Sequence, residues 1–191
     1  MNQPGENHPT ELRRLSGGSG THVLVAGIGN VFLGDDGFGV QVAAQLADRA
    51  FPENVEVADY GIRGFDLASA LLECDAAIIV DAIPRAGKEA GELFVLEPAL
   101  GELEEPGGEV VNGHGMTPLE VFRLVRRFGG TLPPTYLVGC QPGLDVEEGG
   151  SMELSAPVAA AVPGAADLVA SLVHQLAAAP PAPASTAGKE S

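Results

Sequence analysis

Short apolar runs alternate along this chain with segments in which apolar residues recur at helical spacing. The apolar runs predict β-strands at residues 21–27, 54–59, 76–83, 91–98 and 134–140. The helical spacing, with an interruption or kink expected near Pro163, predicts helices at residues 38–50, 64–72, 118–128 and 155–176. This alternation predicts an α/β fold, a three-layer sandwich in which a largely parallel sheet carries helices on both faces.

Two of these elements carry signals beyond periodicity. Residues 76–83, AAIIVDAI, form a continuous apolar run, which predicts a central strand buried on both faces. Thr117 and Glu120 have the spacing of a capping box, and Pro118 suits the first helical position, so a helix is expected to begin there. In such sheets the functional site lies at the carboxyl ends of the strands, and the search for chemistry starts there.

The two ends of the chain differ in composition from the part between them. Residues 1–20 are polar and rich in Gly, Pro and Ser, and residues 178–191 are rich in Pro and Ala, so we expect a disordered leader and a disordered tail. The 191-residue chain is 45% hydrophobic, which fits a single α/β domain over residues 21–177.

The formal charge of −16 narrows the range of partners. So acidic a surface repels nucleic acid and anionic membranes, and we expect neither as a partner. We find no signal peptide and no apolar run that approaches the ~20 residues needed to span a bilayer, so we expect a cytoplasmic protein. Cys74 and Cys140 form no CxxC pair, and we expect free, buried thiols.

The turn after the first strand, GIGNVFLGDDGFG at residues 27–39, has glycines where a phosphate-binding loop has them. The dinucleotide fingerprint needs a third glycine, but position 32 is Phe, and the segment lacks the lysine of a P-loop. Asp35 and Asp36 would also oppose the charge of a pyrophosphate. A metal site suits this turn better than a nucleotide site.

Further acidic residues end the neighbouring strands. Asp81 is the sole charge in its apolar run, and we expect a functional role because an unpaired buried carboxylate is costly. Asp59 ends the second strand, where capping the next turn explains it as well as a direct role does. Asp35 fits a turn or helix cap better than a metal ligand. Gly27, Gly29 and Asn30 are expected to shape the loop, with Asn30 and Asp59 as candidates for supporting the ligands.

One of the four histidines stands out. His114 lies in NGHG directly before the capped helix, where flanking glycines leave the ring unobstructed, although an ordinary loop histidine explains it equally well. Asp36, Asp81 and His114 together supply two oxygen donors and one nitrogen donor, which suits Zn, Mn, Fe or Ni and leaves positions open for water or substrate. HExxH is absent, so this is not a helix-borne zinc protease site.

The ordered motifs resemble those of the hydrogenase maturation proteases, endopeptidases that trim the large subunit of nickel–iron hydrogenases. The resemblance covers about residues 22–176 and rests on VLVAGIGNVFLGDDGFGVQVAAQL, VADYGIRGFDL, AAIIVDAI, GHGMTPLEVFRL and YLVGCQPGLDVEEGGSMELSAPVAAAV. It implies a twisted five-stranded sheet and a site in which Asp36, Asp81 and His114 recognise the metal and carry the catalysis.

The resemblance also implies a reaction and a partner. The large-subunit precursor carries a C-terminal extension, which the protease removes once nickel has been inserted, and nickel in the precursor is the recognition signal. We therefore expect nickel supplied by the precursor. The sequence offers no Ser-His-Asp or Cys-His set, so we expect metal-assisted attack by water. Two alternatives stay open, a non-catalytic nickel-sensing accessory protein and a generic metal-dependent hydrolase on the same fold.

Overall fold

The structure is a computed structural model that describes residues 20–98, 117–143 and 152–178. The leader and the tail expected at the two ends of the chain lie outside these ranges, apart from Gly20 and Ala178, and stay predictions. His114 also lies outside the described residues.

Five strands form one sheet in the order β2-β1-β3-β5-β4. Neighbouring strands are parallel except for the edge strand β4, which runs antiparallel to β5. Every strand falls where the apolar runs predict one: β1 Val23–Ile28, β2 Val55–Gly61, β3 Ala76–Ala82, β4 Leu93–Leu96 and β5 Thr135–Cys140.

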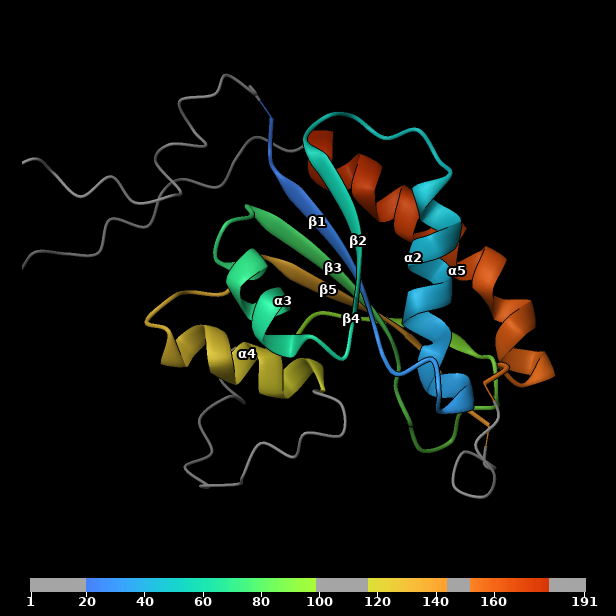
Figure 1. The fold of residues 1–191 in the computed structure, drawn as a ribbon. Helices are drawn as coiled ribbons and strands as arrows, with labels where there is room; N and C mark the ends of the chain where they lie inside the picture. The colour runs from blue at the N-terminus through green and yellow to red at the C-terminus, as the bar shows by residue number, and fades with distance from the viewer. Residues whose placement is uncertain (1–19, 99–116, 144–151, 179–191) are drawn as a thin grey trace, which may run out of the picture.

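Helices cover both faces of this sheet (Figure 1). Helices α2, Phe38–Ala47, and α5, Ala156–Ala178, cover one face, and α3, Gly64–Leu71, and α4, Pro118–Arg127, cover the other. A short 3-10 helix, η1 Gly34–Gly37, leads into α2. The predicted three-layer α/β sandwich with a five-stranded sheet is confirmed.

The core is divided by the sheet into two apolar layers. Every residue of β3 is buried, as the continuous apolar run predicts, and its side chains alternate between the layers. Ile78 and Val80 pack toward α2 and α5, whereas Ala77 and Ile79 pack toward α3 and α4. By this alternation Asp81, the next residue after Val80, points to the same side as Ile79.

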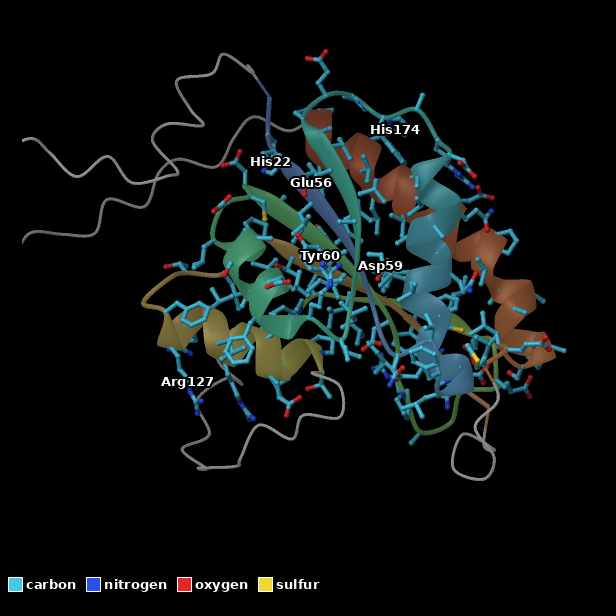
Figure 2. The ribbon with its side chains drawn as sticks, in the orientation of Figure 1. His22, Glu56, Asp59, Tyr60, Arg127 and His174 are labelled. Carbon is cyan, nitrogen blue, oxygen red and sulfur yellow. The ribbon has the colours of Figure 1, made fainter. Side chains whose placement is uncertain are left out.

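Helix α4 begins with the predicted capping box. The Thr117 hydroxyl accepts the N–H of Glu120, and the Glu120 carboxylate accepts the N–H of Thr117. Arg127, at the far end of α4, lies away from the carboxyl ends of the parallel strands (Figure 2). The first turn of α4 therefore faces those strand ends, on the side of the sheet to which Asp81 points.

Helix α5 differs from the expectation in two respects. It runs unbroken through Pro163, so the predicted interruption is absent. It has 23 residues and contains an 18-residue window with a mean hydropathy of 1.6, so it is also long and apolar enough to cross a membrane, although no such run was expected. The helix instead packs against the sheet through Val158, Val169 and Val173, and Asp167 accepts a hydrogen bond from Arg49 at 2.8 Å.

Two glycines let α2 lie directly against the sheet. A Cβ on Gly39 would lie 2.1 Å from the carbonyl oxygen of Val80 and 2.4 Å from that of Ile28. A Cβ on Gly27 would lie 2.2 Å from the carbonyl oxygen of Gly39. Since real Cβ atoms do not approach other atoms so closely, the start of α2 can take this position only with glycine at both sites.

Gly39→Ala is therefore expected to lower the free energy of unfolding by more than about 2 kcal/mol, because the new methyl group meets backbone that cannot move aside. Gly164→Ala is the matched control, a helical glycine whose added Cβ has Leu93 Cδ1 as its nearest neighbour at 3.5 Å. Alanine there should be neutral or stabilising, by up to about 1 kcal/mol. Urea unfolding of both variants measures the difference, and equal midpoints would contradict the close approach.

Candidate active site at the carboxyl edge of the sheet

Four strands end at one edge of the sheet, which we call the carboxyl edge and define by the last residues of the parallel strands, Ile28, Gly61, Ala82 and Cys140. Asp81 lies next to this edge, beside Gly139 of β5. Asp36 lies in η1, which follows β1 at the same edge. The structure thus brings together the two predicted acidic residues that it describes.

The Asp36 side chain is held by the turn that precedes it. Its Oδ2 atom accepts the N–H of Asn30 at 2.6 Å. Gly29, at φ 123°, permits this turn, because a Cβ there would lie 1.8 Å from the main-chain oxygen of Asp36. Within the described part of the chain the other oxygen, Oδ1, accepts no hydrogen bond, so Asp36 keeps one oxygen for a ligand.

Asp81 has an unusual protonation equilibrium. Its side chain is only 8% exposed. Burial, followed by the negative charge of nearby Asp36, raises the pKa of Asp81 to about 8, against a smaller opposing effect of the N–H of Ala82. At neutral pH the pair therefore holds one protonated carboxyl, Asp81, a pattern found in active sites.

Asp35 serves a different purpose from its neighbour. It is buried, and its two oxygens accept hydrogen bonds from the N–H of Gly143 at 2.7 Å, the N–H of Ser155 at 2.6 Å and the hydroxyl of Ser155 at 2.8 Å. These donors lie just after β5 and just before α5. Asp35 is thus structural, but among the described residues it anchors a distant segment and does not form the expected cap of its own turn or helix.

Asn30 and Asp59, the two residues predicted to support the metal ligands, lie in different elements and make different contacts. Asn30 holds Asp36 through its main-chain N–H, and its side-chain oxygen accepts the N–H of Phe32 at 3.0 Å, so it shapes the loop. Asp59 is exposed on β2 opposite Gly27, and its main-chain oxygen accepts a hydrogen bond from the Arg63 side chain. Among the described residues no hydrogen bond joins Asp59 to Asp36 or Asp81.

The described histidines lie away from this edge. His22 precedes β1 at the opposite edge, where its Nε2 atom lies 3.6 Å from a Glu56 oxygen, and His174 is exposed on α5 (Figure 2). Within residues 20–98, 117–143 and 152–178, no group of three or more His, Cys, Asp and Glu side chains could hold a metal ion. Asp36 and Asp81 are two donors of an incomplete set.

Comparison with known proteins decides the family. The sequence profile of a family described as hydrogenase maturation protease matches residues 40–172. The chain is 34% identical over 157 residues to the hydrogenase expression/formation protein HupD of Bradyrhizobium diazoefficiens, covering 80% of this chain and 78% of the relative. The chain belongs to the hydrogenase maturation protease family.

Solved structures agree with this assignment. The hydrogenase maturating endopeptidase HybD from E. coli superposes with a TM-score of 0.65 at 25% identity, covering 81% of this chain and 93% of HybD. A hydrogenase 2 maturation peptidase from a Thaumarchaeota archaeon superposes with a TM-score of 0.60 at 31% identity, covering 80% and 98%. The protein is therefore an endopeptidase of the maturation protease type.

Neither cysteine of this maturation protease provides a nucleophile at the carboxyl edge. Cys140 is buried, and burial, followed by the charge of Asp35, raises the pKa of its thiol to about 12. A thiol with such a pKa stays protonated and unreactive at neutral pH. Cys74 follows α3, near the opposite edge of the sheet, and is half-buried. Neither cysteine forms a disulfide, as the sequence predicts, but Cys74 is only half-buried, so the expectation of two buried thiols is confirmed for Cys140 alone.

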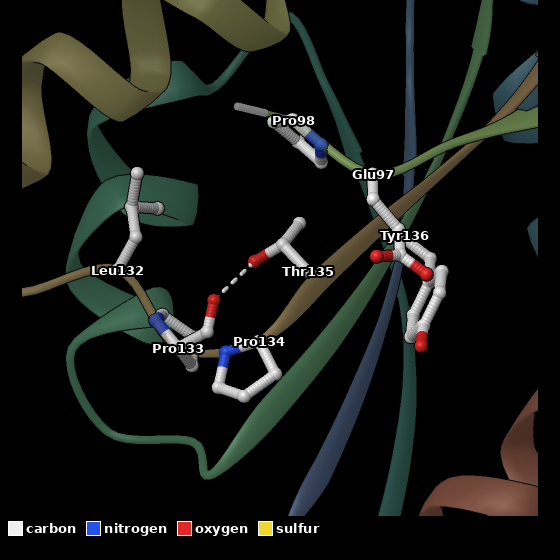
Figure 3. Close-up of a pocket in the computed structure, with 7 residues that line it drawn as sticks. All are labelled: Glu97, Pro98, Leu132, Pro133, Pro134, Thr135 and Tyr136. Atoms are coloured by element: carbon white, nitrogen blue, oxygen red, sulfur yellow. Dashed lines mark hydrogen bonds between the residues drawn. The ribbon is translucent and has the colours of Figure 1, made fainter. Parts of the chain in front are cut away.

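A pocket of about 270 Å³ lies at the opposite edge from Asp36 and Asp81 (Figure 3). It is lined by the end of β4 and the start of β5, through Glu97, Pro98 and residues 132–136. No predicted site residue lines it. Asp36 and Asp81, which we call the acid pair, are therefore the better candidate for the active site of the maturation protease, and the pocket has no part in it.

Asp81→Asn is expected to stabilise the folded protein at neutral and alkaline pH. The folded-state pKa of Asp81 exceeds its unfolded value of 3.8, so the favourable contribution of its protonated form is lost as pH rises through about 8. Between these values each pH unit costs the wild type up to about 1.4 kcal/mol that the amide variant does not lose. The difference in melting temperature should widen from pH 4 to pH 8 and then level off.

Asp35→Asn is the matched control in the same melting experiment. Its amide group would turn a donor toward the N–H of Gly143 or the donors of Ser155, so stability should fall by about 1–3 kcal/mol. If Asp81→Asn also lowers the melting temperature at every pH, the surroundings of Asp81 in the folded protein do not disfavour its ionised carboxylate.

Proposed function

We propose that this endopeptidase removes the C-terminal extension of a nickel–iron hydrogenase large-subunit precursor, and that it recognises nickel already bound in that precursor. Membership of the maturation protease family supports the peptidase activity and the hydrogenase precursor as its substrate. One observation supports the nickel-recognising site, the buried, protonated Asp81 beside Asp36 at the carboxyl edge. We infer that the reaction takes place in the cytoplasm, where such a precursor is made.

Nickel fits the described donors as a visiting ion better than as a resident one. Asp36 and Asp81 offer carboxylate oxygens and no thiolate, and two such donors hold a transition metal weakly. A cation between them would offset the repulsion that raises the pKa of Asp81 and would displace its proton, so Asp81 acts first as a proton donor and becomes a ligand only once that proton has been transferred. An ion that arrives on the thiolates of the precursor would gain these oxygens as additional ligands.

His114 is our proposed third ligand. It precedes Thr117 by three residues, and Thr117 caps the end of α4 that faces the carboxyl edge. Three residues of chain span at most about 10 Å, which limits how far His114 can lie from that end of α4. Its imidazole would complete the oxygen, oxygen, nitrogen set with Asp36 and Asp81.

The acid pair suits peptide hydrolysis. A group with a pKa near neutrality is an efficient proton donor and acceptor, and the pKa of Asp81 is about 8. We propose that Asp36, held by the N–H of Asn30, orients an attacking water molecule and takes up its proton, while Asp81 gives its own proton to the leaving amide nitrogen. This division of roles resembles that of an aspartic-type peptidase. Nickel of the precursor would add polarisation of the carbonyl or of the water.

A processing assay tests the proposal and the source of the metal together. Protease and nickel-loaded precursor are each treated with chelator, freed of it and then combined, and loss of the C-terminal extension is followed by mass spectrometry. We expect treatment of the protease to leave cleavage unchanged, because its own donors hold nickel weakly, and treatment of the precursor to prevent cleavage.

The other outcomes separate the alternatives. Cleavage lost only after treatment of the protease would mean that nickel belongs to the enzyme. Nickel-dependent association without any cleavage would indicate a sensing accessory protein. Cleavage of model esters or phosphates without a hydrogenase precursor would indicate a generic metal-dependent hydrolase.

His114→Ala is expected to reduce processing by at least about 100-fold, as loss of a ligand or its support commonly does, and to leave the melting temperature near that of the wild type. His174→Ala, at an exposed position on α5, is the control and should process at the wild-type rate. Near wild-type processing by the His114 variant would remove His114 from the site, and failure to fold would assign it a structural role.

A further inference from the structure

Large apolar side chains that are exposed to solvent are unevenly distributed over this protein. Among the described residues, eight large hydrophobic side chains are exposed: Phe32, Leu33, Ile62, Phe65, Val95, Leu119, Phe128 and Met152. Single exposed apolar residues are ordinary in soluble proteins, but a group of them marks an interaction surface.

Five of these eight residues come from the turns and helix starts at the carboxyl edge on the side of Asp36, Asp81 and α4. We call this group the apolar rim and define it as Phe32, Leu33, Ile62, Phe65 and Leu119. Phe32 and Leu33 lie between β1 and η1, Ile62 and Phe65 lie at the start of α3, and Leu119 lies in the first turn of α4. Of the other three, Val95 lies in the edge strand, Phe128 after the end of α4 and Met152 shortly before α5.

The apolar rim is joined to the acid pair through the backbone. The main-chain oxygen of Leu33 accepts the N–H of Asp36 at 3.2 Å, so this rim residue and the candidate catalytic residue belong to one turn. The N–H of Gly29 is bonded to the oxygen of Gly61 at 3.0 Å, which ties that turn to the one that carries Ile62. The turns that carry Phe32, Leu33 and Ile62 are therefore tied through the backbone to the turn that carries Asp36.

Charged groups at the start of α3 interact with one another and with neighbouring residues. Arg63 lies 3.8 Å from an Asp66 oxygen, stacks over the ring of Tyr60 at 5.7 Å and bonds the main-chain oxygens of Asp59 and Tyr60. Arg63 and Asp66 nevertheless remain more than half exposed, at 59% and 64%. The start of α3 therefore offers an incoming chain the apolar surface of Ile62 and Phe65 beside a charged pair.

We propose that the apolar rim binds apolar side chains of the hydrogenase large-subunit precursor next to its scissile bond. The proposal rests on the proposed function, since it adds a docking surface to the same active site. The rim lies on turns fixed by hydrogen bonds, so little ordering is needed when the precursor binds. Binding removes these side chains from water and sets the scissile bond against Asp36 and Asp81.

The test compares two phenylalanines of similar exposure. Phe65 is 55% exposed in the rim, and Phe128 is 48% exposed outside it. Both are replaced by alanine, and both are assayed with a nickel-loaded large-subunit precursor. We expect Phe65→Ala to raise KM for the precursor about tenfold with kcat within twofold of wild type, as for an interface anchor. Phe128→Ala should leave both constants unchanged.

Further measurements separate failure of the rim from failure of the proposed function. Phe65→Leu should restore most of the affinity, because an apolar contact needs no aromatic ring. Equal KM values for the Phe65 and Phe128 variants, while the wild type cleaves, would overturn the rim and leave the function intact. If the wild type does not cleave, binding of the precursor by each variant is measured directly, and unchanged binding by Phe65→Ala again overturns the rim.

A second copy of this chain is the other possible occupant. Sedimentation velocity of the wild type and of Phe65→Ala distinguishes it. We expect both to sediment alike. A wild-type dimer that Phe65→Ala dissociates, with precursor binding unchanged, would assign the rim to self-association and overturn the proposal.

Discussion

The close approach of α2 to the sheet is the constraint on which the candidate site depends. Gly39 lies against the carbonyl oxygens of Ile28 and Val80, at distances that leave no room for a side chain. Ile28 is the last residue of β1 and Val80 lies two residues before the end of β3, so both oxygens lie close to the carboxyl edge. Because α2 starts there, the short helix η1 must fit between β1 and α2, and this places Asp36 within electrostatic reach of Asp81. The glycine contacts are a packing feature, but their consequence is chemical.

Two adjacent aspartates show how far one residue position can change the role of a carboxylate. Asp35 is buried and accepts three hydrogen bonds, so its oxygens serve the fold. Asp36 accepts one, and keeps an oxygen for chemistry. Asp81 is buried beside the charge of Asp36, and its pKa rises mainly because of that burial and further because of that charge. The same functional group is thus an anchor, a candidate base and a candidate acid within one edge of a sheet.

Local signals in the sequence were enough for most of the fold. The buried run of β3 and the capping box of α4 specify their elements without help from the rest of the chain, and the acids that end strands could be located from the parallel topology alone. Contacts between residues far apart in the sequence could not be predicted from it. The partners of Asp35 lie 108 and 120 residues away, and no local pattern connects them. Pro163 was expected to interrupt or kink α5, and the interruption is absent because the apolar face of this helix packs against the sheet along its length.

The anchoring by Asp35 has a consequence for how the chain can vary in length. One carboxylate holds Gly143 and Ser155, the two sides of a single connection between β5 and α5. Since both sides are fixed to the same point, residues can be inserted or deleted between them without moving either β5 or α5. The entropy of closing such a loop grows only with the logarithm of its length, about 0.6 kcal/mol for each doubling. Asp35 therefore fixes the end of β5 relative to the start of α5, whatever the length of chain between Gly143 and Ser155.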